Sequence, residues 1–411
     1  MRNTIYSSVP HKLLTALVII SMVMVALPVT MAHAASTISV TTTDDEFTGA
    51  GNKCSLREAI ALANSNASNA NDCSRIGGID ADDIILLESG STYTLTIAGV
   101  GGTSVGDLDV GDSGGASGNL TIETTGVAPA TIDGNDLDRV LDVDAIGNPS
   151  LTLNNIIVTN GNTTGLATTT GGGISFAGTG TLTLTNSTVS NNVSANAAGC
   201  GGGIYNNSAA TVVITDSTIS GNTCATAGSD GAGIFKGNGG SLTITGSTIS
   251  GNSTAENGGG VHIGAGVSTI TVNITNSTLA NNTAGNRGGG LQVGGSTAVV
   301  TVDFTTISDN IANANNMPSP DLNGGGALQV SLGSVTVTRS ILANSIVTNG
   351  ALGTPKDCDK AGTPVVNITD SIVENDNDCG GSFTLGDPSL VALADNGGPT
   401  QTMAIPITSN A

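Results

Sequence analysis

The sequence predicts an all-β protein: a parallel β-helix, in which successive turns of the chain stack on one another, with a short α-helix capping its N-terminal end. Three observations lead to this fold class. A motif recurs through the middle of the chain at intervals of about 30 residues. Each copy alternates apolar and polar residues, and one amphipathic helical stretch precedes the copies.

The repeat is clearest in four segments whose starts are 30 residues apart. In each segment apolar and polar side chains alternate over five residues, which is the pattern of a half-buried strand. A second apolar position follows, and then a glycine-rich run with a third. Three short strands per period, separated by Gly and Asn, are typical of one turn of a parallel β-helix. The four segments are TLTLTNSTVSNN (181–192), TVVITDSTISGN (211–222), SLTITGSTISGN (241–252) and TVNITNSTLANN (271–282).

The second apolar position of each repeat makes the predicted register testable. We expect these residues to stack as one column inside the β-helix, with neighbours about 4.8 Å apart, the spacing of paired strands. The column consists of Val189, Ile219, Ile249, Leu279 and Ile307.

An asparagine stands just after each of these strands. Stacked side-chain amides can hydrogen bond along the axis of the β-helix, and Asn tolerates a left-handed turn, so we interpret the row as a structural ladder. The alternative interpretation is a row of ligand donors. The five residues are Asn192, Asn222, Asn252, Asn282 and Asn310.

The repeats differ in length at one place, between the asparagine turn and the next glycine-rich strand. Insertions at equivalent positions of a solenoid emerge on the same side, so this side is a candidate recognition surface. The variable segments are 193–200, 223–230, 253–257, 283–287 and 311–323.

The stretch CSLREAI (54–60) is rich in helix-forming residues, unlike its surroundings. Ser55 and Glu58 have the spacing of a helix capping box, and Leu56, Ile60 and Ala63 fall on one helical face. A β-helix exposes unpaired strand edges at its ends. We therefore expect this helix to lie on the first turn and cap it.

The N-terminal residues predict a secretory signal peptide. Basic residues at Arg2 and Lys12 precede an apolar stretch at 13–29, and an A-x-A cleavage pattern follows at 32–34. A membrane anchor is the alternative, but the apolar run is short for a span. Once the signal is removed, we expect no transmembrane helix. The predicted organisation is a signal peptide at 1–34, an N-terminal cap at 35–80, β-helix repeats at 81–385 and a C-terminal segment at 386–411.

Six cysteines in an exported chain predict disulfides. They fall into three local pairs, and no pair has C-x-x-C spacing. His262 is the one histidine after the predicted signal, which argues against a zinc site; it alternates with Val261 and Ile263, and we expect it to face solvent. The predicted disulfides are Cys54–Cys73, Cys200–Cys224 and Cys358–Cys379.

The formal net charge of −21 argues against nucleic acid as a partner, because phosphate binding needs a basic surface. It also disfavours polyanionic sugars. The chain has no Trp and three Tyr, whereas sugar-binding clefts usually contain aromatic faces. The basic residues of the repeats are scattered over many turns: Arg139, Lys236, Arg287 and Arg339.

The stretch DGNDLDR (133–139) holds the candidate catalytic residues Asp133, Asp136, Asp138 and Arg139. Two carboxylates at a suitable separation can act as acid and base on a glycosidic bond. However, Asp-Gly-Asn is also typical of a turn, and we favour that interpretation.

A second acidic stretch, DLDVGD (107–112), suggests calcium. Asp107 and Asp109 stand at alternate positions, with Asp112 beyond, and hard oxygen ligands suit Ca²⁺. No acid recurs at a fixed place in the repeats, so the chain is not a calcium-repeat array. We expect no cofactor and keep calcium at these three residues as a hypothesis.

Both ends of the mature chain resemble a known family. CSLREAIALAN (54–64), followed by GDLDV (106–110), resembles the CSLREA-domain proteins of bacteria. GDPSLVALADNGGPTQTMAI (386–405) is similar to the C-terminal motif of choice-of-anchor Q proteins. The resemblance implies a right-handed parallel β-helix related in architecture to pectate lyases. Members are mostly secreted or surface proteins without an established activity.

These observations predict a monomeric protein that is secreted or held at the cell surface. We expect a structural or adhesive, adhesin-like role, with extracellular polysaccharide or cell-surface components as partners. The alternative is a carbohydrate-active enzyme, either a polysaccharide lyase or a glycoside hydrolase on the same fold. We lean towards no enzymatic activity, because fold alone is weak evidence for catalysis.

Overall fold

The computed structural model describes residues 35–406, apart from gaps at 48, 50, 66, 79–81, 100, 112–117, 167–169, 197–198, 316–323, 350–351 and 376–377. The described residues belong to one compact unit. The predicted signal peptide at 1–34 and the calcium candidate Asp112 lie outside the described residues. Within the described ranges, no helix has the length and apolarity needed to cross a membrane.

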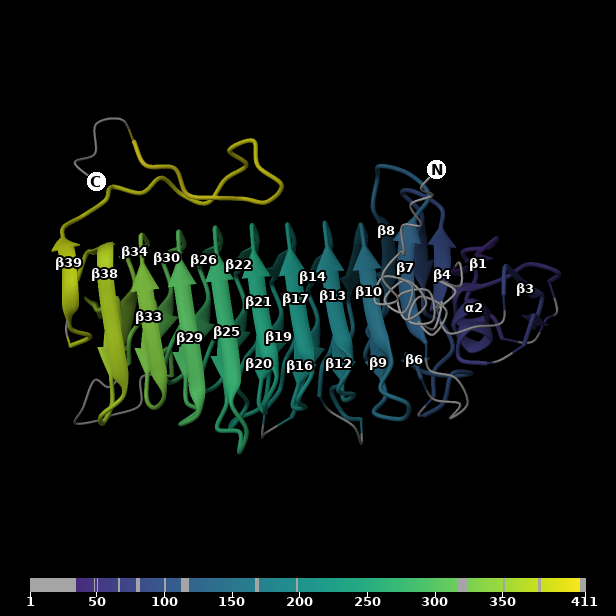
Figure 1. The fold of residues 1–411 in the computed structure, drawn as a ribbon, viewed down its shortest axis with the longest axis horizontal. Helices are drawn as coiled ribbons and strands as arrows, with labels where there is room; N and C mark the ends of the chain where they lie inside the picture. The colour runs from purple at the N-terminus through teal and green to yellow at the C-terminus, as the bar shows by residue number, and fades with distance from the viewer. Residues whose placement is uncertain are drawn as a thin grey trace, which may run out of the picture. The chain divides into compact units, whose positions relative to one another are not determined.

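The described chain forms an all-β parallel solenoid whose turns stack strand on strand (Figure 1). The longest strands form what we name the long ladder. It consists of β4 (Asp82–Leu87), β7 (Asn119–Thr124), β10 (Ser150–Asn154), β13 (Thr181–Thr185), β17 (Thr211–Thr215), β21 (Ser241–Thr245), β25 (Ile270–Thr275), β29 (Ala298–Asp303), β33 (Ser334–Thr338) and β38 (Val365–Val373).

A second ladder follows the long one after a tight turn. It consists of β5 (Thr92–Thr94), β8 (Ala130–Asp133), β11 (Ile156–Thr159), β14 (Thr188–Ser190), β18 (Thr218–Ser220), β22 (Thr248–Ser250), β26 (Thr278–Ala280), β30 (Thr306–Ser308) and β34 (Ile341–Ala343).

The glycine-rich runs lead into a nine-stranded sheet, named here the glycine ladder. It consists of β6 (Leu108–Val110), β9 (Leu141–Val143), β12 (Ile174–Phe176), β16 (Ile204–Asn206), β20 (Ile234–Lys236), β24 (Val261–Ile263), β28 (Leu291–Val293), β32 (Leu328–Val330) and β37 (Cys358–Lys360).

The sequence predicted three strands per turn, and the structure adds a fourth. These additional strands form a seven-stranded sheet, the short ladder, and its first five strands begin the variable segments that were expected to be loops. Most of its strands have two residues, too few for an alternating pattern to be recognised. They are β15 (Val193–Ser194), β19 (Thr223–Cys224), β23 (Ser253–Thr254), β27 (Thr283–Ala284), β31 (Ile311–Ala312), β35 (Ile346–Asn349) and β36 (Leu352–Pro355).

The predicted register of the repeats is confirmed. Val189 pairs with Ile219, and the pairing continues through Ile249, Leu279 and Ile307, one residue per strand of the second ladder. All five side chains are fully buried. The alternating apolar residues of the long ladder also point inward, so one continuous apolar core runs through the stacked turns.

The asparagine turn differs in one detail from the expectation. The left-handed residue is the one before each predicted asparagine: φ is 57° at Asn191, 59° at Asn281 and 57° at Asp309, and Gly occupies the equivalent positions 221 and 251. The predicted residues, such as Asn192, instead point into the solenoid and are fully buried.

The first turn is built from β1 (Ser36–Ser39), α2 (Leu56–Ala63), β2 (Asn69–Ala70) and β3 (Cys73–Ile76). Strand β1 pairs with β4 in parallel and with β3 in antiparallel orientation. Both halves of the predicted capping box of α2 are present: Ser55 accepts from the Glu58 N–H, and the Glu58 carboxylate accepts from the Ser55 N–H.

The last turn ends at β39 (Gly381–Leu385), and the chain then runs back over the ladders to β22 (Figure 1). There the Thr400 hydroxyl donates to the carbonyl of Gly246 (3.0 Å), and Thr248 donates to the carbonyl of Gln401 (2.5 Å). Met403, in the same segment, is buried. We name residues 386–406 the return segment; their place beside turns more than a hundred residues earlier was not predicted.

Candidate functional site

The structure brings some of the predicted acidic residues together in a partly buried group, which we name the acid–arginine cluster. It consists of Asp107, Asp109, Asp138, Arg139 and Asp142, at the start of the glycine ladder. Arg139 Nε lies 2.8 Å from Asp107 Oδ2, and its Nη1 lies 3.1 Å from Asp142 Oδ2. One carboxylate oxygen from each of Asp107, Asp109 and Asp142 lies within 4.8 Å of the others.

The other two catalytic candidates lie apart from this cluster, in a turn. Asp133 ends β8, and its Oδ1 accepts from the N–H of Asn135 (2.9 Å) and from Asn160 Nδ2 (3.0 Å). Asp136 is exposed and has a left-handed φ of 56°. Such contacts are typical of turn residues and agree with the interpretation of DGNDLDR as a turn.

Burial governs the electrostatics of the acid–arginine cluster. It raises the pKa of Asp107 to about 7, although the neighbouring Arg139 guanidinium opposes this shift. Burial also raises the pKa of Asp138, whose Oδ1 accepts from the Arg139 N–H at 2.7 Å. The cluster can therefore bind a proton near neutral pH, and Arg139 provides its neutralising charge.

Two surface hollows lie elsewhere. One of about 320 Å³ is lined by Val40, Thr41, Thr42, Thr43, Asp44, Lys53, Glu88 and Tyr93. The other, of about 400 Å³, is lined by Thr124, Gly126, Val127, Asn154, Asn155 and Asn186. Neither includes a residue of the acid–arginine cluster, so these hollows do not give a substrate access to the perturbed carboxyl groups.

Arg57 of the CSLREA stretch explains how that motif and GDLDV are related in space. Its guanidinium donates to the carbonyls of Gly106 (2.8 Å) and Asp107 (2.9 Å) and forms an ion pair with Asp45, with Nε 2.7 Å from Oδ1. Asn64, at the end of α2, donates to the carbonyl of Asp109 (2.7 Å). Helix α2 thus holds the chain that enters the acid–arginine cluster, a role that sequence reasoning missed.

The predicted asparagine ladder is continuous and saturated. Asn192 Nδ2 donates to Asn222 Oδ1 (3.0 Å), and the same bond recurs at 2.9, 2.9 and 3.0 Å through Asn252, Asn282 and Asn310. Each Nδ2 also donates to a main-chain carbonyl of a neighbouring turn, as Asn222 does to Val189 (3.0 Å). Because these amides are buried and bonded to one another, they present no donors to a ligand.

A serine ladder runs beside it and was not recognised from the sequence. The N–H of Ser187 donates to the hydroxyl of Ser217 (3.1 Å), and Ser217 and Ser247 repeat this bond to the next turn. The signal was present as the Ser of each "NST", "DST" or "GST" triplet. Both ladders secure turns of the solenoid and carry no chemistry.

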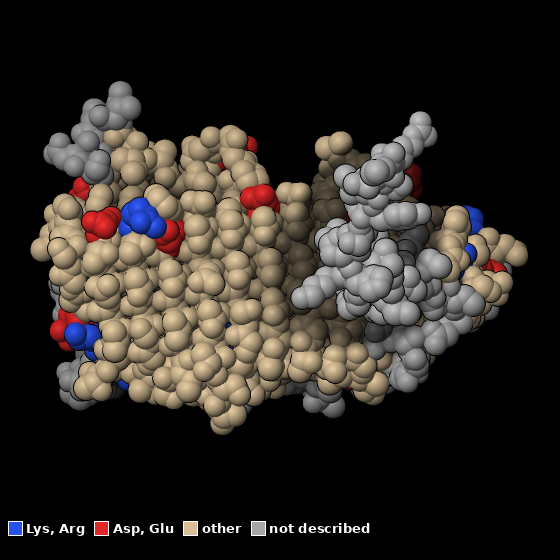
Figure 2. Space-filling model, in the orientation of Figure 1, with Lys and Arg blue, Asp and Glu red and all other residues tan. Residues whose placement is uncertain are grey.

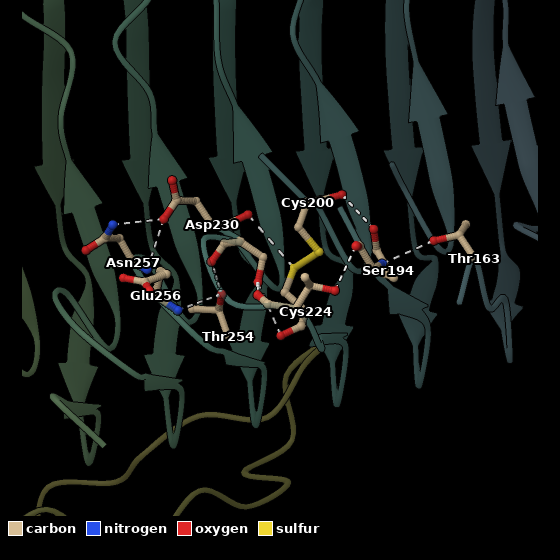
Figure 3. The surroundings of a disulfide bond; sticks show 11 residues. Thr163, Ser194, Cys200, Cys224, Asp230, Thr254, Glu256 and Asn257 are labelled. Carbon is tan, nitrogen blue, oxygen red and sulfur yellow. Dashed lines mark hydrogen bonds between the residues drawn. A yellow bond between two sulfur atoms is a disulfide. The ribbon is translucent and has the colours of Figure 1, made fainter. Parts of the chain in front are cut away.

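All three predicted disulfides are present, with Cα–Cα distances of 4.6, 6.0 and 5.8 Å in chain order. Figure 3 shows the second, Cys200–Cys224, where two neighbouring variable segments meet. Beside it, the hydroxyl of Ser194 donates to the carbonyl of Cys200 (3.2 Å). The disulfide therefore joins successive turns on the side that was predicted to carry the variable segments.

The next variable segments are also linked to each other (Figure 3). Asp230 Oδ1 accepts from the N–H (3.0 Å) and Nδ2 (2.9 Å) of Asn257. The hydroxyl of Thr254 donates to the carbonyl of Ser229 (2.6 Å). This candidate recognition surface is thus cross-bonded at its base and does not consist of independent loops.

The expectation that His262 faces solvent is wrong. Its side chain points away from the core, as the alternation indicates, but is only 7 % exposed. Its ring stacks on Phe235 with centroids 5.5 Å apart, and Phe235 stacks on Tyr205 at 5.3 Å. Burial lowers the pKa of His262, and Asp230, 3.8 Å from Nε2, opposes the shift. The three rings stack on one another, so the ring faces between them are closed to a sugar.

Lys236 is likewise not available as a surface base. It points into the solenoid and is fully buried, with Nζ donating to Asn206 Oδ1 (2.6 Å) and to the carbonyls of Ser208 (2.6 Å) and Asn238 (2.9 Å). Burial lowers its pKa to about 8. These three hydrogen bonds join the stacked turns of two neighbouring repeats.

The outer face of the long ladder is a regular surface that is nearly uncharged (Figure 2). From β7 to β33, all of it within the described chain, the outward positions include two acids, Glu123 and Asp303, and no lysine or arginine. Threonine is the commonest residue on it. The net charge of −21 is thus carried by other parts of the molecule.

No protein-family model, curated protein or solved structure matches this chain. The fold and the geometry above are therefore the basis for its function.

Proposed function

We propose that this chain is an exported structural or adhesive protein that binds a neutral surface, such as extracellular polysaccharide, through the outer face of the long ladder. The observation that carries the proposal is the nearly uncharged, hydroxyl-rich character of this face in a strongly acidic chain. Hydroxyl groups bind neutral sugars without the cost of desolvating a charge. Many weak contacts along a rigid array also add up without a deep pocket.

Export is supported by the disulfides and by the predicted signal peptide. Three buried disulfides are typical of proteins from oxidising compartments. We further propose membership of the CSLREA and choice-of-anchor Q proteins, with their right-handed winding. In this proposal α2 caps the first turn, supported by the burial of Leu56 and Ile60 and by the contacts of Arg57.

A carbohydrate-active enzyme is the second candidate, favoured by the raised pKa of Asp107, since perturbed carboxyl groups often mark active sites. Against it, Asp107 is buried in an ion pair with Arg139, and the partly exposed Asp142 is paired with the same arginine. We expect no release of reducing ends or unsaturated products from a polysaccharide panel, with or without Ca²⁺. Activity abolished by Asp138→Asn would replace the adhesive function with an enzymatic one.

Binding is tested by co-sedimentation of the full chain with insoluble cellulose and chitin, with soluble pectate as an anionic comparison. We expect retention on a neutral polymer and none on pectate. Thr243→Lys places a charge in the middle of the long ladder and should reduce retention. Thr218→Lys, on the second ladder, is the matched control and should not. Equal loss in both variants would reject the long ladder as the binding face.

A further inference from the structure

Four neighbouring strands of the long ladder, β13, β17, β21 and β25, present an ordered array of threonines, which we name the threonine grid. Nine of its twelve outward positions are threonine. The exceptions are Val213, Ser241 and Asn273. The nine residues are Thr181, Thr183, Thr185, Thr211, Thr215, Thr243, Thr245, Thr271 and Thr275.

The grid is regular in both directions. Thr181 pairs with Thr211, and every outward residue of the four strands pairs with its equivalent without a bulge. Outward side chains are therefore about 4.8 Å apart from one strand to the next and about 6.7 Å apart along a strand. Threonine is β-branched and has few χ1 rotamers, so its hydroxyl and methyl groups are held in place before any ligand arrives.

The hydroxyls of the grid are largely free. Within the described chain, those of Thr183, Thr243 and Thr245 make no hydrogen bond to protein, whereas Ser241 donates weakly to Thr211 (3.4 Å). Each can bond to an external oxygen, and each adjacent methyl group can order water around it.

The partner of this grid must be neutral and periodic. The grid has no charged residue, in a chain of net charge −21, so neither an anionic nor a cationic polymer would meet a counter-charge there. It also has no aromatic ring, so any ligand must bind through the hydroxyl and methyl groups alone. A lattice of water molecules fits both conditions, because it needs only hydrogen bonds and matched spacing.

We propose that the threonine grid binds ice. The surface of hexagonal ice exposes rows of water oxygens whose repeat distances are close to the two spacings of the grid. Hydroxyls in register would join the lattice, and the methyl groups would fill the gaps between its rows. The inference rests on the proposed function, because it takes the same face as the binding surface and names its partner.

The experiment uses the full chain in two assays: partition into a slowly growing ice front, and the gap between melting and freezing of a single ice crystal. The wild type should be enriched several-fold in ice over an acidic non-binding protein and should produce faceted crystals. Thr183→Tyr combined with Thr243→Tyr should cause a several-fold loss in both assays, because the rings break the spacing while tyrosine suits a strand.

The matched control is Thr188→Tyr combined with Thr218→Tyr, on outward positions of the second ladder. Circular dichroism of every variant confirms the fold before the assays. Equal loss in the control pair would overturn the inference. A wild type that stays out of ice but binds cellulose or chitin would overturn it and leave the proposed function standing. Failure to bind ice and every polysaccharide would reject both.

Discussion

At the scale of single residues, buried polar groups join segments that are distant in the sequence. Arg57 is the clearest case, because one guanidinium holds Asp45 and two carbonyls at residues 106 and 107. Arg57 stands out in a chain with only 11 basic residues, but the sequence does not show which groups it contacts. Two of them are main-chain carbonyls of a loop, and nothing in a residue's identity marks its carbonyl as an acceptor.

Arg57→Met should lower the free energy of unfolding by about 3 kcal/mol, since it leaves Asp45 without its buried partner. Urea denaturation followed by circular dichroism measures the change. Arg339→Met is the matched control: this arginine is half exposed and pairs with Asp303, so its loss should cost less than about 1 kcal/mol. Equal effects would show that the buried contacts of Arg57 contribute nothing specific.

The raised pKa of Asp107 predicts a pH dependence of stability. In the folded chain this pKa is about 7, whereas an aspartate in an unfolded chain titrates near 4. Between these values the folded state holds a proton that the unfolded state has lost, so stability increases as pH falls through the window. The thermal midpoint should therefore rise from pH 8 to pH 5.

Asp107→Asn isolates this effect, because the amide cannot titrate. Its thermal midpoint should rise less over the same pH range than that of the wild type. Asp136→Asn, at an exposed turn position, should keep the wild-type pH dependence. An Asp107→Asn variant with the full rise would assign the pH dependence to other acids.

At the scale of elements, alternation along the strands predicted the long ladder and the register of the second ladder, since each buried strand leaves a period-two pattern. It could not predict the short ladder, whose two-residue strands such as Val193–Ser194 leave no pattern. It also misjudged His262, because alternation gives the direction of a side chain and not what covers it. The covering group, Phe235, belongs to the previous turn.

The asparagine ladder should carry much of the coupling between turns. Asn252→Ala removes bonds to Asn222, Asn282 and the carbonyl of Ile219 and leaves their partners buried, so it should cost about 2–4 kcal/mol. Asn273→Ala, on the exposed face of β25, should change stability by less than about 0.5 kcal/mol. Similar unfolding midpoints for both variants would contradict a structural role for the ladder.

At the scale of the whole solenoid, stability is the sum of contacts between neighbouring turns, with one exception. The return segment is this exception, because Thr400 and Gln401 hydrogen bond to Gly246 and Thr248, which lie several turns earlier. The DNGGPTQT motif drew attention in the sequence, but its docking surface could not be predicted, because the segment has neither helical nor strand periodicity.

Met403→Ala should loosen the return segment, since Met403 is a large apolar side chain of this segment that is buried. We expect faster proteolysis within residues 386–405 and little change in the melting of the ladders. Mass spectrometry of the fragments locates the cuts. Ile405→Ala is the control, because Ile405 is 45 % exposed, and it should change the rate much less. A rate that Met403→Ala does not alter would mean that burial of Met403 does not hold the segment in place.

The return segment also decides where mechanical tension enters the molecule. A pull on the C-terminus would not act first on β39, the terminal strand, which could be peeled away one hydrogen bond at a time. It would load the bonds of Thr400 and Gln401 to β22 and the turn before it, several turns inside the solenoid. Strand β22 has a neighbouring strand on each side, and both share the force. The terminal strand β39 therefore bears no load until the return segment detaches.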